Sequence, residues 1–475
     1  METASHSKET IIEVELFKKQ INALKELLEL QVTVANIKTE QENHGEAETH
    51  YRQALSLKID LAVAYNNLGY VLTDQGQHND AVINCQYAIL LNPDFAEAHH
   101  TLGIALSRQR KLDEAAASFQ KAIFLNPELK ESHKNLGIVL SIQGKFDDAA
   151  VYCQHAISLD PNSAEAHYVL GSILGRQGKL DDALKSYKKV ISINPGNADA
   201  HVSMAIIYWL KEDLSDLAKS IESSNNVGDL ATHSADFVVP YRKFLSNLLV
   251  YKKRRQDLYS NSKQLPVLYV VGDSHSLSAS NIVVKLNGVE HRMQSKIIVG
   301  CKAWHLANNS DNQYKCQLEL ISKTIPDGAT VIVIFGEIDC RINTGIIKHH
   351  RKTNNDLSET IKKLAQDYVS FVTGIFSNRS VKIIFSGIPA IPDFNNRLST
   401  EDKVIWSKSI DLINSSIKTE AAKKNCKNLD LYSLTRKSDN RDFEDCFIDE
   451  YHINPLIFVN AVSQIGASGE KAVNI

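Results

Sequence analysis

The sequence predicts a multidomain protein in which an all-α array of helical repeats is followed by an α/β domain with a mostly parallel sheet. Three observations lead to this fold class. The chain has 475 residues, which is too long for one compact core. One stretch repeats itself with a 34-residue period. From Leu265 onward, the pattern changes to short apolar runs bounded by glycine and polar residues.

Composition narrows the classes of partner. Hydrophobic residues make up 43% of the chain, charged residues make up 23%, and the net charge is −3, so no excess of charge indicates nucleic acid as a partner. The amino terminus lacks the uninterrupted apolar segment of a signal peptide, and no stretch reaches the roughly 18 apolar residues of a membrane helix. We therefore expect a cytoplasmic protein with neither nucleic acid nor membrane as its partner. The seven cysteines lack CxxC spacing, which favours reduced thiols.

Three columns of residues define the repeat. Each column has the same 34-residue spacing, and the columns comprise Gly69, Gly103, Gly137 and Gly171; Ala81, Ala115, Ala149 and Ala183; and Pro93, Pro127, Pro161 and Pro195. Small residues allow two antiparallel helices to pack closely, and proline cannot continue the second helix and so begins a turn. Each unit is therefore predicted to be a helix pair, and residues 62–197 make four clear units.

In length and pattern these units resemble the tetratricopeptide repeat. The resemblance implies a right-handed solenoid whose concave face binds a protein or peptide. The units are especially similar to those of O-linked N-acetylglucosamine transferases, which carry concave-face asparagines before an L-G pair. Asn67 and Asn135 match that position whereas Thr101 and Val169 do not, and no glycosyltransferase domain follows.

The repeats set the expected domain boundaries. We predict an N-terminal helix and degenerate capping repeat over 1–61, tetratricopeptide repeats over 62–225, a closing helix and linker over 226–264, and the α/β domain over 265–475. The closing helix ends in a basic run that we expect to be solvated. Histidine also recurs at 34-residue spacing, at His99, His133, His167 and His201, but equivalent positions in stacked repeats lie too far apart to share a metal ion.

Beyond residue 265, apolar runs alternate with helical patterns, which predicts a parallel sheet covered on both faces. In such sheets ligands bind at the carboxyl ends of the strands. Polar loops follow three of the runs, at 272–275, 300–302 and 336–341, and a fourth polar segment at 449–452 precedes a terminal helix expected near Pro455.

The order of these four segments resembles the four sequence blocks of the SGNH/GDSL hydrolases. This resemblance spans residues 265–460 and implies a three-layer α/β/α domain. It makes Ser274 the nucleophile, His452 the general base and Asp449 the residue that orients the imidazole. It also assigns the oxyanion hole to Ser274, Gly300 and Asp339. Asp273, His275, Gly336, Glu337 and Arg341 are further pocket candidates.

One oxyanion position departs from the family, because Asp339 stands where the family has asparagine. An ionised carboxylate would repel an oxyanion, so three accounts stay open. In the first account, Asp339 is protonated. In the second, it is paired to Arg341, which then becomes the donor to the oxyanion. In the third, the site does not catalyse ordinary ester hydrolysis.

Structural roles are the alternatives at each position. Ser274 would cap a helix starting at Leu277, Asp449 and His452 would form a surface pair, and Glu337 with Asp339 would bind backbone amides in a turn.

The leading hypothesis is a serine esterase or acyltransferase acting on an acyl or acetyl ester. The substrate would be an acylated small molecule or glycan, with the repeats binding a protein partner or the substrate. The alternative is a non-catalytic repeat scaffold with a degenerate SGNH-like domain. No cofactor or metal is expected, because nucleotide-binding glycine loops and HExxH are missing from the sequence.

Overall fold

A computed structural model describes the chain at residues 27, 30–41, 43–56, 62–225, 235–259, 264–299, 301–307, 312–335, 356–389, 400–435, 447 and 452–467. The chain divides into two compact units, Met1–Val169 and Leu170–Ile475, called here the N-terminal unit and the C-terminal unit. The last two-helix repeats thus belong to the same unit as the sheet. The boundaries predicted at 61, 225 and 264 stay predictions.

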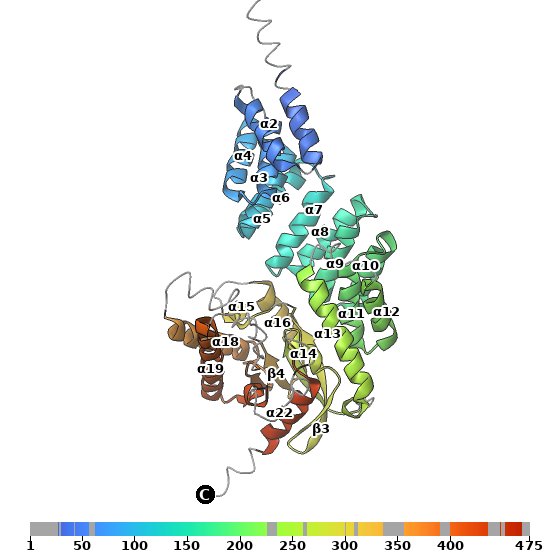
Figure 1. Ribbon diagram of the computed structural model, residues 1–475, viewed down its shortest axis with the longest axis vertical. Coiled ribbons are helices and arrows are strands. Elements are labelled where there is room, and N and C mark those ends of the chain that lie inside the picture. Colours follow the sequence, from blue (N-terminus) through green and yellow to red (C-terminus); the bar gives the residue numbers. More distant parts are fainter. Residues whose placement is uncertain are drawn as a thin grey trace, which may run out of the picture. The chain divides into compact units, whose positions relative to one another are not determined.

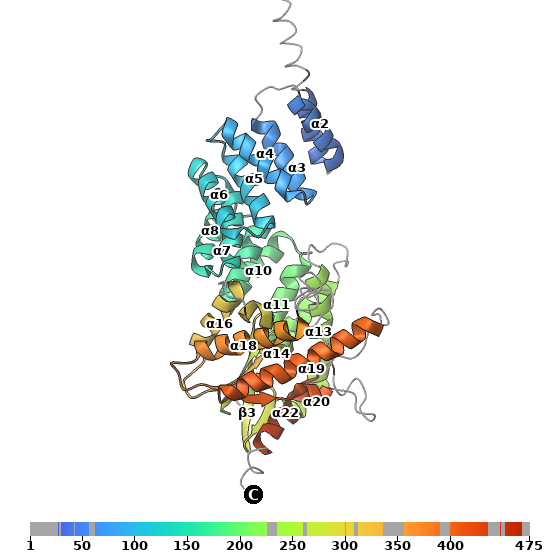
Figure 2. The same ribbon diagram turned by 90° about the vertical axis from the view of Figure 1, so that its left-hand side faces the viewer.

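The N-terminal unit consists of paired helices (Figures 1 and 2). They are α2 (His44–Ser56), α3 (Ala62–Asp74), α4 (His78–Leu91), α5 (Ala96–Arg108), α6 (Leu112–Leu125), α7 (Lys130–Ile142) and α8 (Phe146–Leu159), and α9 (Ala164–Arg176) begins here. A Cβ added at Gly103 would lie 2.7 Å from the Phe119 ring, and one at Gly69 would lie 2.6 Å from Cys85 Sγ. The glycine column is therefore where the two helices of each pair approach most closely.

The recurring histidines have a structural role in the repeats. His133 Nε2 lies 2.9 Å from the carbonyl oxygen of Pro127, and His99 Nε2 lies 3.1 Å from that of Pro93. His167 and His201 make the same contact with the proline carbonyl six residues earlier. Each ring thus ties the first helix of a repeat to the turn before it.

The C-terminal unit begins with helices that continue the repeat pattern. They are the end of α9, α10 (Leu180–Ile193), α11 (Ala198–Lys211), α12 (Leu214–Asn225) and α13 (Ala235–Arg254). Helix α11 is buried almost all round, from His201 to Trp209, as expected of a helix covered on several sides. Helix α13 packs against both α11 and α12.

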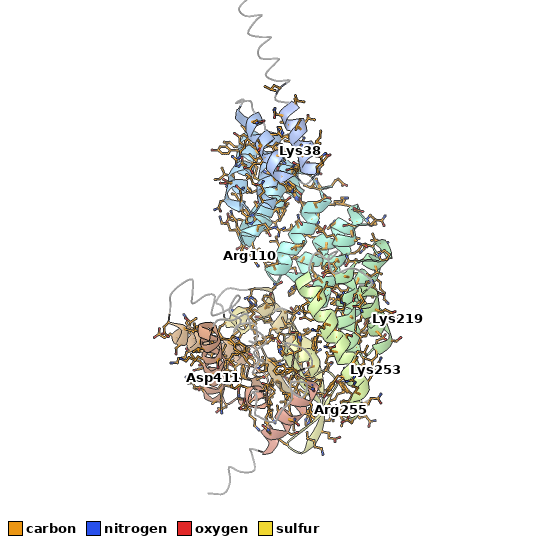
Figure 3. All side chains as sticks on the ribbon, in the orientation of Figure 1. Lys38, Arg110, Lys219, Lys253, Arg255 and Asp411 are labelled. Atoms are coloured by element: carbon orange, nitrogen blue, oxygen red, sulfur yellow. The ribbon has the colours of Figure 1, made fainter. Side chains whose placement is uncertain are left out.

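The basic end of α13 is only partly solvated. Lys253 projects from the surface (Figure 3), as expected. The Lys252 ammonium instead lies 5.6 Å from the centre of the Trp209 ring and 4.9 Å from that of Tyr259, within cation–π range. The basic run therefore also holds α13 to its neighbours.

A six-stranded mixed sheet forms the centre of the C-terminal unit. Its strands are β1 (Val267–Gly272), β2 (Val283–Leu286), β3 (Val289–Ile297), β4 (Thr330–Ile334), β5 (Lys382–Ser386) and β6 (Lys427–Leu429), in the order β2-β3-β1-β4-β5-β6. Strand β2 is antiparallel to β3, and all other pairs are parallel. The chain passes from β1 to β3 on one side and then to β4 on the other, so the strand order reverses at β1. Crevices at such switch points bind ligands in open α/β sheets.

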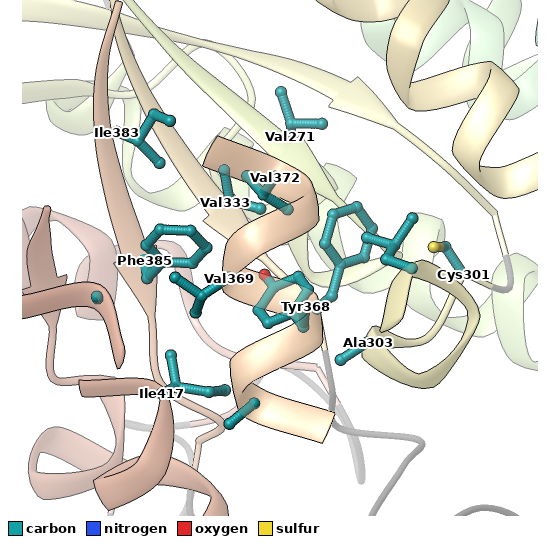
Figure 4. Close-up of a cluster of buried hydrophobic side chains, with 14 of the residues drawn as sticks. Val271, Cys301, Ala303, Val333, Tyr368, Val369, Val372, Ile383, Phe385 and Ile417 are labelled. Carbon is teal, nitrogen blue, oxygen red and sulfur yellow. The ribbon is translucent and has the colours of Figure 1, made fainter. Parts of the chain in front are cut away.

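Helices cover both faces of the sheet. One face packs against α15 (Ala303–Ala307), α16 (Gln313–Lys323), α18 (Leu357–Ile375) and α19 (Thr400–Lys423). The other packs against α20 (Leu431–Thr435) and α22 (Pro455–Ala467). Because successive strand side chains alternate between faces, Val271, Val333 and Phe385 point together into the first core, where they meet Tyr368 and Val372 of α18 (Figure 4).

Candidate functional site

Ser274 lies just beyond the carboxyl end of β1, in the turn that leads into the short helix α14 (His275–Ser278). It occupies the N-cap position of α14, but its side chain makes no capping hydrogen bond. Its Oγ lies instead 3.0 Å from Nε2 of His452, which is 178 residues further along the chain. The structure therefore brings these two sequence-predicted residues together.

Gly272 fixes the path of this turn. It pairs with Ile297 of β3 on one side and with Ile334 of β4 on the other. A Cβ at position 272 would overlap the carbonyl oxygen and side chain of Ile334. Only glycine lets β1 end between its two neighbours without displacing β4, and the Ser274 turn starts from that point.

Asp273 and His275 are buried parts of the same turn. Asp273 Oδ1 accepts a hydrogen bond from the backbone N–H of His275 at 3.0 Å and lies 3.1 Å from its Nδ1. The carbonyl of Asp273 accepts from the Ser276 hydroxyl at 2.7 Å. These contacts hold the backbone on both sides of Ser274 in place. The side chains of Asp273 and His275 are almost fully buried.

His452 is held by the segment that leads into α22. Ile453 makes a β-bridge with Phe447, and the Asn454 side chain accepts a hydrogen bond from the N–H of Leu456 at 2.9 Å. Helix α22 starts at Pro455, as predicted, with proline at the first helical position where it is best tolerated. The imidazole is 7% exposed, so its orientation is set by its neighbours.

Two aromatic rings flank this imidazole. The Phe244 ring of α13 stacks on it at a centroid distance of 3.7 Å and an angle of 11°. The His275 ring lies 5.5 Å away at 43°. The sequence analysis did not identify Phe244, which lies outside the segments that carry the motifs.

Tyr241, also on α13, is the second residue that sequence reasoning missed. Its hydroxyl forms a hydrogen bond with the Ser274 side chain. Burial raises the pKa of Tyr241 above its ordinary value, and the charge of Asp273 raises it further. The available signal was the spacing of Tyr241 and Phe244, since residues three apart share one face of a helix.

Several predicted site residues lie outside the described residues. They are Gly300, Gly336, Glu337, Asp339, Arg341 and Asp449. Next to them, Cys301 is buried, and the backbone N–H of Lys302 donates to Nδ1 of His305 at 3.1 Å. Within the described part of the chain, no three His, Cys, Asp or Glu side chains gather into a group that could hold a metal ion. Likewise, no helix among the described residues has the length and apolar character needed to cross a membrane.

Comparison with known proteins identifies the repeats. Models described as tetratricopeptide repeat match residues 61–86, 96–129, 131–163 and 164–197. The chain therefore carries tetratricopeptide repeats, followed by a C-terminal region with a mixed sheet. Such repeats stack into scaffolds with extended binding surfaces.

Three solved structures that are similar to this chain each cover less than half of it. YrrB, described as a TPR protein with an unusual peptide-binding site, is 25% identical over 37% of this chain and 91% of its own, with a TM-score of 0.33. PilF of Pseudomonas aeruginosa is 18% identical over 47% and 99%, with a TM-score of 0.41. A thermophilic TPR protein of Thermus thermophilus, TTC0263, is 20% identical over 38% and 98%, with a TM-score of 0.34. No curated protein matches the chain.

Proposed function

We propose that the C-terminal region is a serine esterase or acyltransferase of the SGNH type, with Ser274 as nucleophile and His452 as general base. The observation that carries the proposal is the 3.0 Å separation of Ser274 Oγ and His452 Nε2. A hydroxyl at that distance from an imidazole nitrogen can transfer its proton as it attacks. The pair also lies where ligands bind in this type of sheet.

The proposed reaction proceeds through an acyl-enzyme. Ser274 Oγ attacks the ester carbonyl while His452 takes its proton, and the carbonyl oxygen becomes an oxyanion. Collapse of this intermediate expels the alcohol, which receives the proton from His452. Water or another hydroxyl then attacks the acyl-enzyme by the same steps, which gives hydrolysis or transfer.

Other parts of the proposal rest on the resemblance to SGNH hydrolases. Asp449 would orient the His452 imidazole, and the oxyanion would be bound by the backbone N–H groups of Ser274 and Gly300 and by the position of Asp339. An acylated sugar is the first substrate to test. The repeats would bind a protein or peptide partner on their concave face.

The test is covalent labelling of the full-length protein with a fluorophosphonate probe, together with hydrolysis of a short-chain p-nitrophenyl ester. Ser274→Ala should abolish labelling and lower kcat by at least about 10³-fold. Ser278→Ala is the matched control, because the Ser278 hydroxyl is buried without a hydrogen-bond partner in the described part of the chain. It should label like the wild type.

A non-catalytic repeat scaffold is the second candidate. The observations that favour it are the tetratricopeptide-repeat matches and the carboxylate at Asp339, where an oxyanion donor is expected. On this alternative, wild-type protein with a cooperative unfolding transition would show no labelling and no ester hydrolysis.

A further inference from the structure

Helix α13 joins the last repeats to the sheet, and it also borders the Ser274 turn. It packs against α11 and α12 on one side (Figure 1). On the other side, Tyr241 contacts Ser274 and Phe244 stacks on His452. Helix α11 contacts α14, the short helix that follows this turn, since Trp209 Nε1 donates to the Leu277 carbonyl at 3.0 Å.

The two α13 side chains come from one helical face and touch the two members of the proposed catalytic pair. Tyr241 and Phe244 are three residues apart, so they point in similar directions from the helix. Phe244 is fully buried, which leaves its ring little freedom. The contact with His452 therefore fixes the part of α13 from which Tyr241 projects.

The hydrogen bond between Tyr241 and Ser274 has one direction, because each hydroxyl group carries a single hydrogen. The Ser274 hydroxyl carries one hydrogen, which it donates to His452 Nε2 when it acts as nucleophile. Its remaining capacity is to accept. A phenol whose pKa is raised by burial keeps its proton at neutral pH. Tyr241 is therefore the donor and Ser274 Oγ is the acceptor.

We infer that Tyr241 is a further catalytic residue, whose hydroxyl stabilises the oxygen atoms that carry developing charge during acylation. This role rests on the proposed function. As the Oγ–C bond forms, the Oγ proton moves to His452 Nε2, and the electron pair of the carbonyl π bond moves to the carbonyl oxygen. That oxyanion is bonded to the same carbon as Oγ, so it forms beside the atom to which Tyr241 already donates.

Tyr241 keeps its own proton throughout this step. It supplies one uncharged, preorganised hydrogen bond, which is the arrangement that stabilises oxyanions in acyl transfer. Because the donor belongs to α13, the catalytic site of the sheet is incomplete without the helix that closes the repeats. Through Tyr241 and Phe244, α13 thus connects the last repeats of the C-terminal unit to the candidate catalytic pair.

The test is Tyr241→Phe in the full-length protein, a change that removes only the hydroxyl. We expect kcat for a short-chain p-nitrophenyl ester to fall by about 10²-fold with KM unchanged, because removal of one oxyanion donor costs about 10²- to 10³-fold. The rate of fluorophosphonate labelling should fall in parallel, and the thermal unfolding midpoint should stay near that of the wild type.

Tyr251→Phe is the matched control. Tyr251 lies ten residues further along α13, about 15 Å away at 1.5 Å per residue. It packs against the hydrophobic core on the face of the sheet that α20 and α22 cover. It should retain wild-type kcat. Equal losses in both variants would overturn the inference, because the effect would then belong to the helix and not to the hydroxyl.

The outcomes separate the inference from the proposed function. If labelling depends on Ser274 but Tyr241→Phe reacts as fast as the wild type, only the role of Tyr241 is overturned. If folded wild-type protein is not labelled and hydrolyses no ester, the proposed function fails, and the role of Tyr241 fails with it.

Discussion

The hydrogen bond between Trp209 and the Leu277 carbonyl predicts a measurable contribution to stability. Trp209 is 2% exposed, and its Nε1 lies 3.0 Å from the carbonyl oxygen. In Trp209→Phe, the loss of this bond should cost about 1 kcal/mol. The full penalty of an unpaired carbonyl is not expected, because the N–H of Ser280 still donates to the same oxygen at 3.1 Å.

The smaller ring adds a second cost. Phenylalanine leaves part of the indole volume empty, which should destabilise the C-terminal unit by about a further 1 kcal/mol. The total of about 2 kcal/mol is a large part of the usual 5 to 15 kcal/mol of a folded protein. With a urea m-value of about 3 kcal/mol per M, the unfolding midpoint should fall by about 0.7 M.

Urea unfolding followed by far-UV circular dichroism measures this shift without relying on tryptophan fluorescence. Trp406→Phe is the control, since Trp406 is only partly buried on α19 and the same change should move the midpoint by less than about 0.2 M. If both variants shift the midpoint equally, the bond from α11 to α14 does not stabilise the C-terminal unit, and the reasoning is refuted.

Three further predictions follow from burial and packing. Gly272→Ala should slow labelling of the candidate nucleophile at least about tenfold and destabilise the C-terminal unit by about 1 to 3 kcal/mol, because its Cβ would overlap Ile334; wild-type labelling would contradict this. Burial lowers the pKa of His100 from 6.5 to about 4, so the unfolded chain binds more protons between these values and the N-terminal unit loses stability as pH falls through them. His100→Gln should remove this loss, at most about 3 kcal/mol and less for a partly exposed ring, and urea midpoints at several pH values decide it. Burial raises the pKa of Cys85 to about 12, so iodoacetamide at about pH 8 should modify partly exposed Cys316 first and Cys85 only after unfolding, as read by mass spectrometry; equal rates would count against this.

The sequence predicted the repeats well because their signal is local. Each glycine of the repeat column meets a side chain of the very next helix, as Gly69 of α3 meets Cys85 of α4. The parallel strands β1, β4 and β5 also gave apolar runs that could be recognised, whereas only the end of β3, from Ser295, lay in such a run. Strands β2 and β6 were missed, because such short segments, with lysine or asparagine among their residues, show no clear alternation.

The candidate site was predicted in part. Ser274 and His452 were chosen from the order of motifs along the chain, and the described residues place them in contact. Asp273 was expected to line a pocket, and in the structure it braces the turn through His275 and Ser276. The N-cap alternative for Ser274 predicted a capping hydrogen bond, which its side chain does not make.

By itself, the sequence determined the helical repeats, the alternation that builds the sheet, and the residue types capable of serine chemistry. These depend on neighbours within one or two elements. Only the tertiary structure decided that α13 places Tyr241 and Phe244 on the Ser274–His452 pair. The physical reason is that contacts between distant segments depend on how whole elements pack, and no periodicity within a helix specifies which partner its buried face will meet.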